Sequence, residues 1–305
     1  MAFTLRPYTP SDLATFQALL DAPGIAGQFD TVARPGGVER ILADSYTPSA
    51  GVRLAFVDGE PAGFAFPIVL PGPPAPWAAL RGAVVPRFRR QGIARALHDA
   101  VVAWLEAHAP VREQTISAWE PEPGADGFAA ALGYAHDRWY WLMERPRDGT
   151  PPAPEWPAGV TVRPLDGSDA MLADWNAAYN ASFEAHYRYV ASPLEHAHKL
   201  VESPGFRADG VLLAYRQGRV AGFCRNELHA TRGEVGTLGT VPAARGIGLG
   251  RALLRWGVGW LERESTLPVT LMVDGANDGA LALYRSEGFA VTRTRHAWMR
   301  PGGGA

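Results

Sequence analysis

Residues 241–254 read Val-Pro-Ala-Ala-Arg-Gly-Ile-Gly-Leu-Gly-Arg-Ala-Leu-Leu, and this stretch predicts the fold. A strand ends at Pro242, a glycine-rich turn follows, and a helix begins near Gly250 with Leu253 on its apolar face. Glycines let backbone N–H groups converge without interference from a Cβ. A helix N-terminus adds unpaired N–H groups and a partial positive charge. The segment therefore predicts an anion site suited to a pyrophosphate.

Two familiar phosphate-binding loops do not fit this stretch. The dinucleotide fingerprint Gly-x-Gly-x-x-Gly fails because Arg251 and Leu253 occupy its last position in the two available frames. A P-loop needs Gly-Lys-Ser/Thr, and the only lysine is Lys199. The pattern that fits is Arg-x-x-Gly-x-Gly at 245–250. A glycine-rich turn with a purely structural role is the alternative.

The same pattern occurs in both halves of the chain. Five blocks recur in one order at an offset of 155–159 residues, which indicates a tandem duplication. The first loop reads Arg-Arg-Gln-Gly-Ile-Ala at 89–94, with alanine where the second has its last glycine. The paired blocks begin at Arg6 and Arg163, Ser11 and Ser168, Gly59 and Gly218, Pro86 and Pro242, and Gly133 and Gly288.

A proline-rich stretch separates the repeats. Five prolines in 146–157 favour an extended linker, taken as 147–157, between domains at 1–146 and 158–305. The second repeat predicts the order β-αα-β-β-β-α-β-α-β, which is one mixed sheet flanked by helices. Its expected strands are 160–163, 211–215, 220–228, 235–241, 269–273 and 290–299, and its helices fall in 168–201, 250–262 and 280–286.

Composition excludes several classes of protein. The 305 residues are 47% hydrophobic and 20% charged, so the chain is not disordered. A net charge of −2 gives no basic field for nucleic acid or anionic membranes. No apolar run reaches about 18 residues, and we expect no signal peptide. Cys224 is the only cysteine, and His196 and His198 have the wrong spacing for ligands on one helical face. We therefore expect no disulfide and no metal, and a cytoplasmic location.

A second motif lies about 30 residues after the loop. Residues 277–289 read Asn-Asp-Gly-Ala-Leu-Ala-Leu-Tyr-Arg-Ser-Glu-Gly-Phe. With Arg-x-x-Gly-x-Gly upstream, the chain resembles the GNAT (GCN5-related) acyl-CoA N-acyltransferases in both halves. The resemblance implies an α/β fold of two tandem GNAT domains, each a mixed, mostly antiparallel sheet flanked by helices, with acetyl-CoA as cofactor. The run at 233–242 also resembles the C-terminal half of mycothiol synthases, tandem GNAT proteins with an active C-terminal half.

The resemblance implies which residues form the site. Glu234 matches the acidic base position, and Tyr284 matches the acid that protonates the leaving thiolate. The cofactor-binding residues carried over are Leu238, Gly239, Thr240, Val241, Arg245, Gly246, Ile247, Gly248, Leu249, Gly250, Arg251, Asn277 and Tyr284. A vestigial site in the first repeat comprises Val84, Val85, Arg89, Arg90, Gln91, Gly92, Ile93 and Ala94.

Comparing the repeats predicts which half is catalytic. Ala78 stands where the second repeat has Glu234, and Ala129 where it has Tyr284. Asn277 corresponds to Glu122 in a segment broken by prolines. The first repeat keeps a phosphate loop but lacks both proton-transfer groups. We therefore predict a catalytic C-terminal domain and a degenerate N-terminal one, which is structural or binds CoA without turnover.

The predicted activity is transfer of an acetyl group to a primary amine by direct attack. The acceptor is expected to be a small molecule, with a protein N-terminus or lysine, or a non-catalytic acyl-CoA sensor, as alternatives. We expect a monomer with an internal pseudo-dimer, or a homodimer. A histidine from 186–198 is the alternative base.

Each site residue also has a structural alternative. The alternative for Glu234 is a solvated charge at the edge of a strand. The alternative for Tyr284 is an aromatic residue of the core, and the alternative for Asn277 is a helix cap. Cys224 is expected to be a packed strand residue. We expect Arg225, Glu227 and Arg232 to form a solvated strand face, with contact to a charged acceptor as the alternative.

Overall fold

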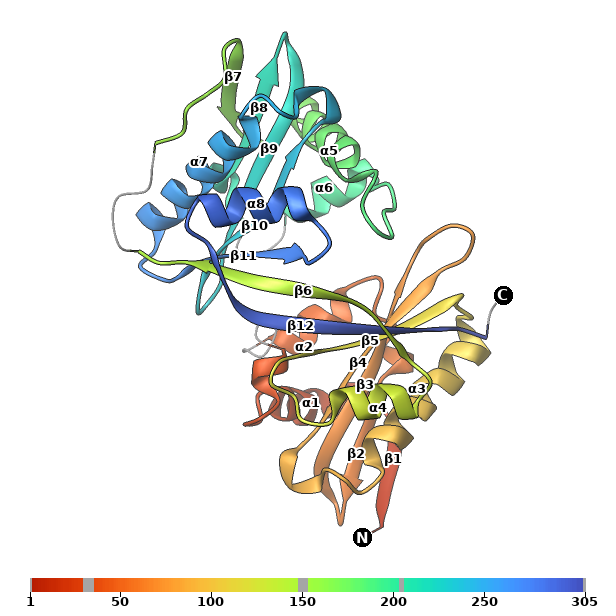
Figure 1. Cartoon of the computed structure of the whole chain (residues 1–305). Coiled ribbons are helices and arrows are strands. Elements are labelled where there is room, and N and C mark those ends of the chain that lie inside the picture. Colours follow the sequence, from red (N-terminus) through yellow and green to blue (C-terminus); the bar gives the residue numbers. More distant parts are fainter. Residues whose placement is uncertain (1, 30–35, 148–152, 203–205, 304–305) are drawn as a thin grey trace. The chain divides into compact units, whose positions relative to one another are not determined.

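The computed structural model describes residues 2–29, 36–147, 153–202 and 206–303, and the chain divides into two compact units. Unit 1 comprises Met1–Trp139 with Thr294–Ala305, and unit 2 comprises Tyr140–Arg293. Each unit is a mixed sheet flanked by helices (Figure 1), as predicted. In the described part of the chain, no helix combines the length and apolarity needed to cross a bilayer.

Unit 2 carries six strands in the order β6-β11-β10-β9-β8-β7, of which only β10 and β11 run parallel. Helices α5 and α6 pack on one face of β8 and β9, and α7 packs on the other (Figure 1). The strands are β6 Ala135–Arg145, β7 Val160–Pro164, β8 Val211–Arg216, β9 Arg219–Leu228, β10 Gly233–Thr240 and β11 Val269–Asp274. The helices are α5 Asp169–Phe183, α6 Leu194–Val201, α7 Leu249–Glu264 and α8 Asp278–Ser286.

Unit 1 repeats this plan in the order β1-β2-β3-β4-β5-β12, with β4 and β5 parallel. Helices α1 and α2 share one apolar cluster with β2 and β3, whereas α3 packs on the opposite face. The strands are β1 Phe3–Pro7, β2 Arg53–Val57, β3 Glu60–Leu70, β4 Trp77–Val84, β5 Glu113–Trp119 and β12 Ala290–Pro301. The helices are α1 Leu13–Leu20, α2 Gly37–Ala43, α3 Ile93–His108 and α4 Ala125–Ala131.

The last strand of each repeat completes the sheet of the other unit. The second half of β6, from Tyr140 to Arg145, pairs antiparallel with β11 in unit 2. The second half of β12, from Arg295 to Pro301, pairs antiparallel with β5 in unit 1. The limits 1–146 and 158–305 therefore follow the sequence repeats, whereas the compact units follow strand pairing. Residues 148–152 of the predicted linker lie outside the described residues.

The predicted order of elements in the second repeat is confirmed, including the two helices after the first strand. The stretch expected to be helix-compatible to about residue 201 holds two helices separated by residues 184–193. Pro193 stands directly before α6, and a proline disfavours helical geometry in the residue that precedes it. Arg188 in the connection has φ +55°, which no helix accommodates.

The parallel strands pair over a short distance and then part. In unit 2, Gly233–Val235 pairs with Val269–Leu271, and the pairing stops there although both strands continue. In unit 1, Trp77–Ala79 pairs with Glu113–Thr115 in the equivalent register. Each sheet is therefore split beyond its paired segment, and the glycine loops follow the open ends of β4 and β10.

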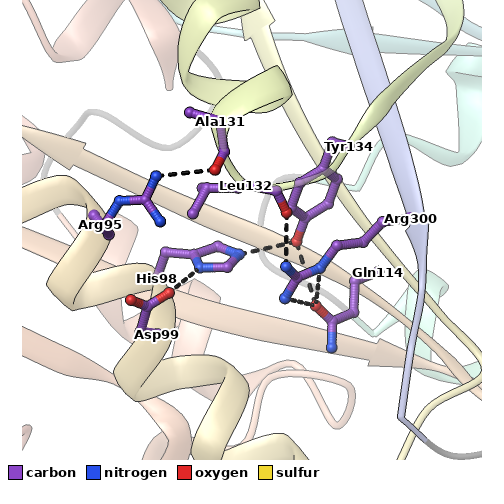
Figure 2. A network of polar contacts seen from close by, with 8 residues as sticks. All are labelled: Arg95, His98, Asp99, Gln114, Ala131, Leu132, Tyr134 and Arg300. Atoms are coloured by element: carbon purple, nitrogen blue, oxygen red, sulfur yellow. Dashed lines mark hydrogen bonds and ion pairs between the residues drawn. The ribbon is translucent and has the colours of Figure 1, made fainter.

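A buried polar network fastens β12 to unit 1 (Figure 2). The Arg300 guanidinium donates to Gln114 Oε1 at 2.8 and 3.0 Å and to the Leu132 carbonyl at 2.8 Å. The Tyr134 hydroxyl lies 3.0 Å from His98 Nε2 and 3.3 Å from Gln114 Oε1. Burial lowers the pKa of His98, so its ring is neutral near pH 7. In unit 2, Leu254 and Phe289 take the places of His98 and Tyr134 by sequence, so the network is specific to unit 1.

Replacing Arg300 with alanine is expected to destabilise unit 1, although Arg300 comes from the second repeat. The loss of three charge-assisted hydrogen bonds should cost about 2 kcal/mol. Hydrogen exchange should show faster opening of β5 and α4, with β11 and α7 unchanged. The exposed Arg219→Ala in β9 is the control and should change stability by less than about 0.5 kcal/mol. Equal loss of protection in both units would contradict the strand assignment.

Candidate functional site

The glycine loop of unit 2 leaves the N-terminus of α7 open. Gly246 and Gly248 have φ of +78° and +89°, a region that residues with a Cβ rarely adopt. Gly248 is the N-cap of α7, and no side chain caps the helix. A Cβ built on Gly248 would meet nothing within 4 Å. The first N–H groups of α7 thus face open space, which is the geometry an anion needs.

Two arginines hold the loop and helix in position. Arg245 donates from Nε to the Thr240 carbonyl at 3.3 Å and from Nη2 to the Ser182 carbonyl at 3.0 Å. These contacts tie the loop to the end of β10 and to the last turn of α5. Arg251 pairs with Glu287 at 3.0 Å, so its guanidinium is engaged with the residue that follows α8. The Arg245 guanidinium therefore stabilises the loop through hydrogen bonds to backbone carbonyls of β10 and α5.

A β-bulge at Gly236 changes the face of the sheet toward which the side chains at the start of β10 point. Val235 pairs with Asn226 and Thr237 pairs with the adjacent Arg225, so Gly236 is the extra residue. As a result Glu234, opposite Glu227, lies on the face of the sheet that carries α5. In unit 1, β3 and β4 pair without a shift from Gly63–Val84 to Leu70–Trp77. Ala78 there lies on the face that packs against α3.

Glu234 lies in a network of charged side chains. Its Oε2 is 3.0 Å from Arg232 Nε and 3.4 Å from His229 Nε2, and its side chain is 12% exposed. His229 also approaches Glu227 at 3.7 Å. Glu227 pairs with Arg225 at 2.6 Å. The network continues along β9 and β10 because Arg225 donates to Thr237 Oγ1 at 3.2 Å.

This network sets the ionisation of Glu234. Burial acts to raise the pKa of its carboxyl, but the hydrogen bond from His229 and the charge and hydrogen bond of Arg232 outweigh that effect. The net pKa lies below the ordinary value for glutamate. Glu234 is consequently a carboxylate at neutral pH, available to accept a proton or to orient a cation.

Tyr284 on α8 supplies a protonated hydroxyl. Its ring packs at the edge of the core, 6.2 Å from the Phe289 ring. Burial, with a contribution from Cys224, raises the pKa of Tyr284 to about 12. The described part of the chain offers this hydroxyl no hydrogen-bond partner. The phenol thus remains protonated and available to a ligand.

The other predicted cofactor residues fall on three elements. Leu238, Gly239 and Thr240 end β10, and Val241 donates its N–H to the Ala221 carbonyl. A Cβ on Gly239 would lie 2.7 Å from the Phe223 ring and 2.8 Å from Ser182, so only glycine fits there. The side chains of Ile247 and Leu249 belong to the apolar core, and Gly250 is in the first turn of α7. Asn277 caps α8 by accepting from the Ala280 N–H at 3.1 Å.

The expectation of a solvated strand face was wrong. Arg232 is only 6% exposed, and Arg225 and Glu227 are ion-paired, because the bulge and the β9–β10 turn turn these side chains toward one another. Sequence reasoning also missed His229. The available signal was its position two residues after Glu227, at the start of the short turn that leads to Glu234. His186, considered as an alternative base, follows α5 rather than lying in it, and burial lowers its pKa.

Unit 1 keeps the loop and lacks the proton-transfer groups. Gly92 has φ +83° and is the N-cap of α3, as Gly248 is of α7. Arg89 donates to the carbonyls of Val84 and Gly24 at 3.1 Å, as Arg245 does to its counterparts. Ala78 and Ala129 are fully buried. A cavity of about 800 Å³ opens beside this loop, lined in part by Arg90, Ile93 and Ala94.

Comparison with known proteins places these features in a family. The Acetyltransferase (GNAT) family model matches residues 27–134 and 170–289. The chain is 36% identical to a mycothiol acetyltransferase of Salinispora arenicola, covering 82% of this chain and 81% of that one. It is 35% identical to a mycothiol acetyltransferase of Thermobispora bispora, covering 92% and 93%. A GCN5-related N-acetyltransferase from Sphaerobacter thermophilus superposes with a TM-score of 0.77 and 27% identity, covering 98% and 95%.

Removing the charge of Arg232 is expected to raise the pKa of Glu234. The charge of Arg232 and its hydrogen bond both lower that pKa, and the variant removes the charge. The measurement is a ¹³C titration of the Glu234 carboxyl in wild type and Arg232→Gln. Arg225→Gln, which removes a neighbouring charge paired with Glu227, should leave that pKa nearly unchanged. An unchanged pKa in Arg232→Gln would contradict the network.

Proposed function

Since the chain belongs to the acetyltransferase (GNAT) family, we propose that unit 2 transfers the acetyl group to the primary amine of a small molecule. The chain is an N-acetyltransferase, and acetyl-CoA is its acetyl donor. The observation that carries the proposal is the difference between the units. Unit 2 presents Glu234 and Tyr284, and unit 1 has buried alanines in their places by sequence.

The residues of unit 2 fit the donor they would hold. Acetyl-CoA supplies a thioester carbonyl and a thiolate leaving group. The N–H groups at the start of α7 face the open space beside Gly248, where they can meet the pyrophosphate. We assign polarisation of the carbonyl to backbone N–H groups in 238–240, since the Val241 N–H already donates to the Ala221 carbonyl. The backbone of Arg245, Gly246, Ile247, Gly248, Leu249 and Gly250 would hold the phosphates, while the Arg245 side chain orders the loop. Arg251 pairs with Glu287 after α8, and Asn277 caps the first turn of α8.

Glu234 is assigned the role of base. An alkylammonium has an ordinary pKa of about 10.4, so the acceptor must lose a proton before it attacks. A carboxylate with a lowered pKa is a weak base, which suits transfer through a water molecule to solvent. Its negative charge also favours binding of the ammonium form. The neighbouring Arg232 and His229 keep the carboxylate ionised and fix its orientation.

Tyr284 is assigned the role of acid. A phenol with a pKa of about 12 is protonated at neutral pH, whereas an ordinary thiol has a pKa of about 8.5. Burial narrows this difference in pKa between the phenol and the thiol of CoA, because burial also raises the pKa of a thiol, as it does for Cys224 beside Tyr284. A thiolate formed in this apolar setting is therefore a stronger base than in water. The hydroxyl donates its proton to that sulfur.

The names of the relatives point to the acceptor. Both relatives at 35–36% identity are mycothiol acetyltransferases and match most of the chain. We propose the amine of des-acetyl mycothiol, or a closely similar small molecule, as the acceptor. CoA and mycothiol both carry thiols, so the product should be followed by mass rather than with a thiol reagent. Acetylation of peptide amines but not of des-acetyl mycothiol would favour a protein acceptor instead.

The remaining alternative is an acyl-CoA sensor without turnover. The retention of an ionised Glu234 and a protonated Tyr284 in unit 2 argues against it. We further propose a cytoplasmic enzyme, monomeric or homodimeric, without nucleic-acid or membrane partners. The net charge of −2 and the single, buried Cys224 support this setting.

Removing either proton-transfer group should lower turnover and spare donor binding. Tyr284→Phe and Glu234→Gln are each expected to lower kcat/KM by more than about tenfold, within the range of general acid–base catalysis. The affinity for acetyl-CoA should stay within a few-fold. Tyr134→Phe is the control, because burial raises the pKa of Tyr134 to about 12 as well, but that residue lies in unit 1.

Two outcomes would contradict these roles. Full activity in both Tyr284→Phe and Glu234→Gln would show that other groups move the protons. Equal loss in Tyr134→Phe would show that the effect comes from stability rather than from chemistry, and thermal melting of all three variants separates these cases.

A further inference from the structure

The closed end of the split in unit 1 carries Arg81, which no acidic side chain of the described residues pairs with, whereas Arg225 beside Thr237 in unit 2 is paired with Glu227. Pairing of β4 with β5 ends at Ala79 and Thr115, and Arg81 and Ser117 lie two residues beyond. Arg81 Nη1 donates to Ser117 Oγ, so the two side chains meet across the split. Unit 2 has Thr237 at the place of Arg81 and Met272 at the place of Ser117, because Thr115 and Thr270 make the same hydrogen bond to the neighbouring parallel strand and so align β5 with β11.

Arg81 lines the cavity of unit 1 without a carboxylate to balance it. The contact with Ser117 is the one hydrogen bond of its side chain, and the described residues place no acidic group within ion-pair distance. Burial and the nearby charge of Arg295 lower the pKa of Arg81 to about 10, so the guanidinium remains charged at neutral pH. A guanidinium has five donors in a fork that matches a carboxylate.

The rest of the cavity wall is also cationic. Arg89, Arg90, Arg95 and Arg295 line it, and Glu122 is the one acidic residue among the lining residues. Glu122 pairs with Arg89 at 3.0 Å. Arg95 donates to the Ala131 carbonyl, which leaves its charge unbalanced by that contact. A neutral acyl group at the closed end would leave Arg81 without a counter-charge, at a cost that a second anionic group would remove.

We propose that the cavity of unit 1 binds a CoA thioester whose acyl group ends in a carboxylate, with Arg81 and Ser117 holding that carboxylate. The inference rests on the expectation, carried over from the family resemblance, that residues 89–94 hold CoA, and not on turnover in unit 2. With a rise of about 3.3 Å per residue, Arg81 lies roughly 10 Å along β4 from Val84 at the mouth of the loop. A pantetheine arm laid along this stretch of β4 brings the acyl group to Arg81, and a four-carbon dicarboxylic acyl group is the probe used below. Unit 2, where Arg225 beside Thr237 is already paired with Glu227, is suited to a neutral acetyl group.

The test measures acyl-CoA affinity by calorimetry on the full chain carrying Gly248→Glu, which blocks the loop of unit 2. Succinyl-CoA is compared with butyryl-CoA, which has the same number of carbons and no terminal charge. We expect succinyl-CoA to bind at least about tenfold more tightly, the worth of one charge-assisted hydrogen bond. Arg81→Thr, which installs the residue of unit 2, should reduce the preference to less than about threefold. Arg81→Lys should keep part of it.

Arg87→Thr is the matched control, because Arg87 is an exposed arginine just after β4 that pairs with Glu60 at 3.0 Å. It should keep the full preference. If Arg81→Thr does not fold, Arg81→Met provides the same neutral comparison with a longer apolar side chain. Equal affinity for the two thioesters, or a preference that survives loss of Arg81, would overturn the proposal. Binding of free succinate as tightly as succinyl-CoA would also overturn it, because the thioester would then contribute nothing.

Discussion

The proposed chemistry of unit 2 depends on one extra residue, Gly236, in strand β10. The bulge at Gly236 shifts the register of β10 against β9 and turns Glu234 to the face that carries α5. β4 has no such bulge, and Ala78, the counterpart of Glu234 by the sequence offset of the repeats, is buried on the face that packs against α3. A carboxylate there would be buried in an apolar core at a cost of several kcal/mol. The charged network of Arg225, Glu227, His229 and Arg232 depends on the same shift, since it joins side chains from both strands.

The two units share a binding frame and differ in what fills it. In both, a short parallel pair opens into a split, and an arginine behind the loop ties it to the neighbouring backbone. In both, a glycine with positive φ begins an uncapped helix. The differences concentrate at the closed end of the split, where unit 2 has the charged network around Glu234 and unit 1 has Arg81. The glycine loops of the two repeats are thus alike, and the residues at the closed end of the split differ.

Much of this architecture could be predicted from the sequence, because it rests on local patterns. Glycine spacing located both loops, and the repeat comparison identified Glu234 and Tyr284 as the groups that unit 1 lacks. The bulge could not be located, since the alternation around Gly236 reads as an ordinary strand and the shift is a property of the pair. The exchange of the last strands could not be predicted either, because the pairing of β6 with β11 and of β12 with β5 joins residues that are far apart in the sequence. The burial of Arg232 follows from the β9–β10 turn. The pattern of charged residues alone predicted that this side chain is solvated.

The most direct test of the account is the rate of acetyl transfer in two matched variants, Gly248→Glu and Gly92→Glu. Both glycines are N-caps with positive φ and open space around them, so the strain and the added charge are the same. If unit 2 is the catalytic unit, Gly248→Glu should lose transfer because its carboxylate repels the pyrophosphate at the start of α7, and Gly92→Glu should retain it. Loss of transfer in Gly92→Glu with full activity in Gly248→Glu would assign catalysis to unit 1 and contradict the account.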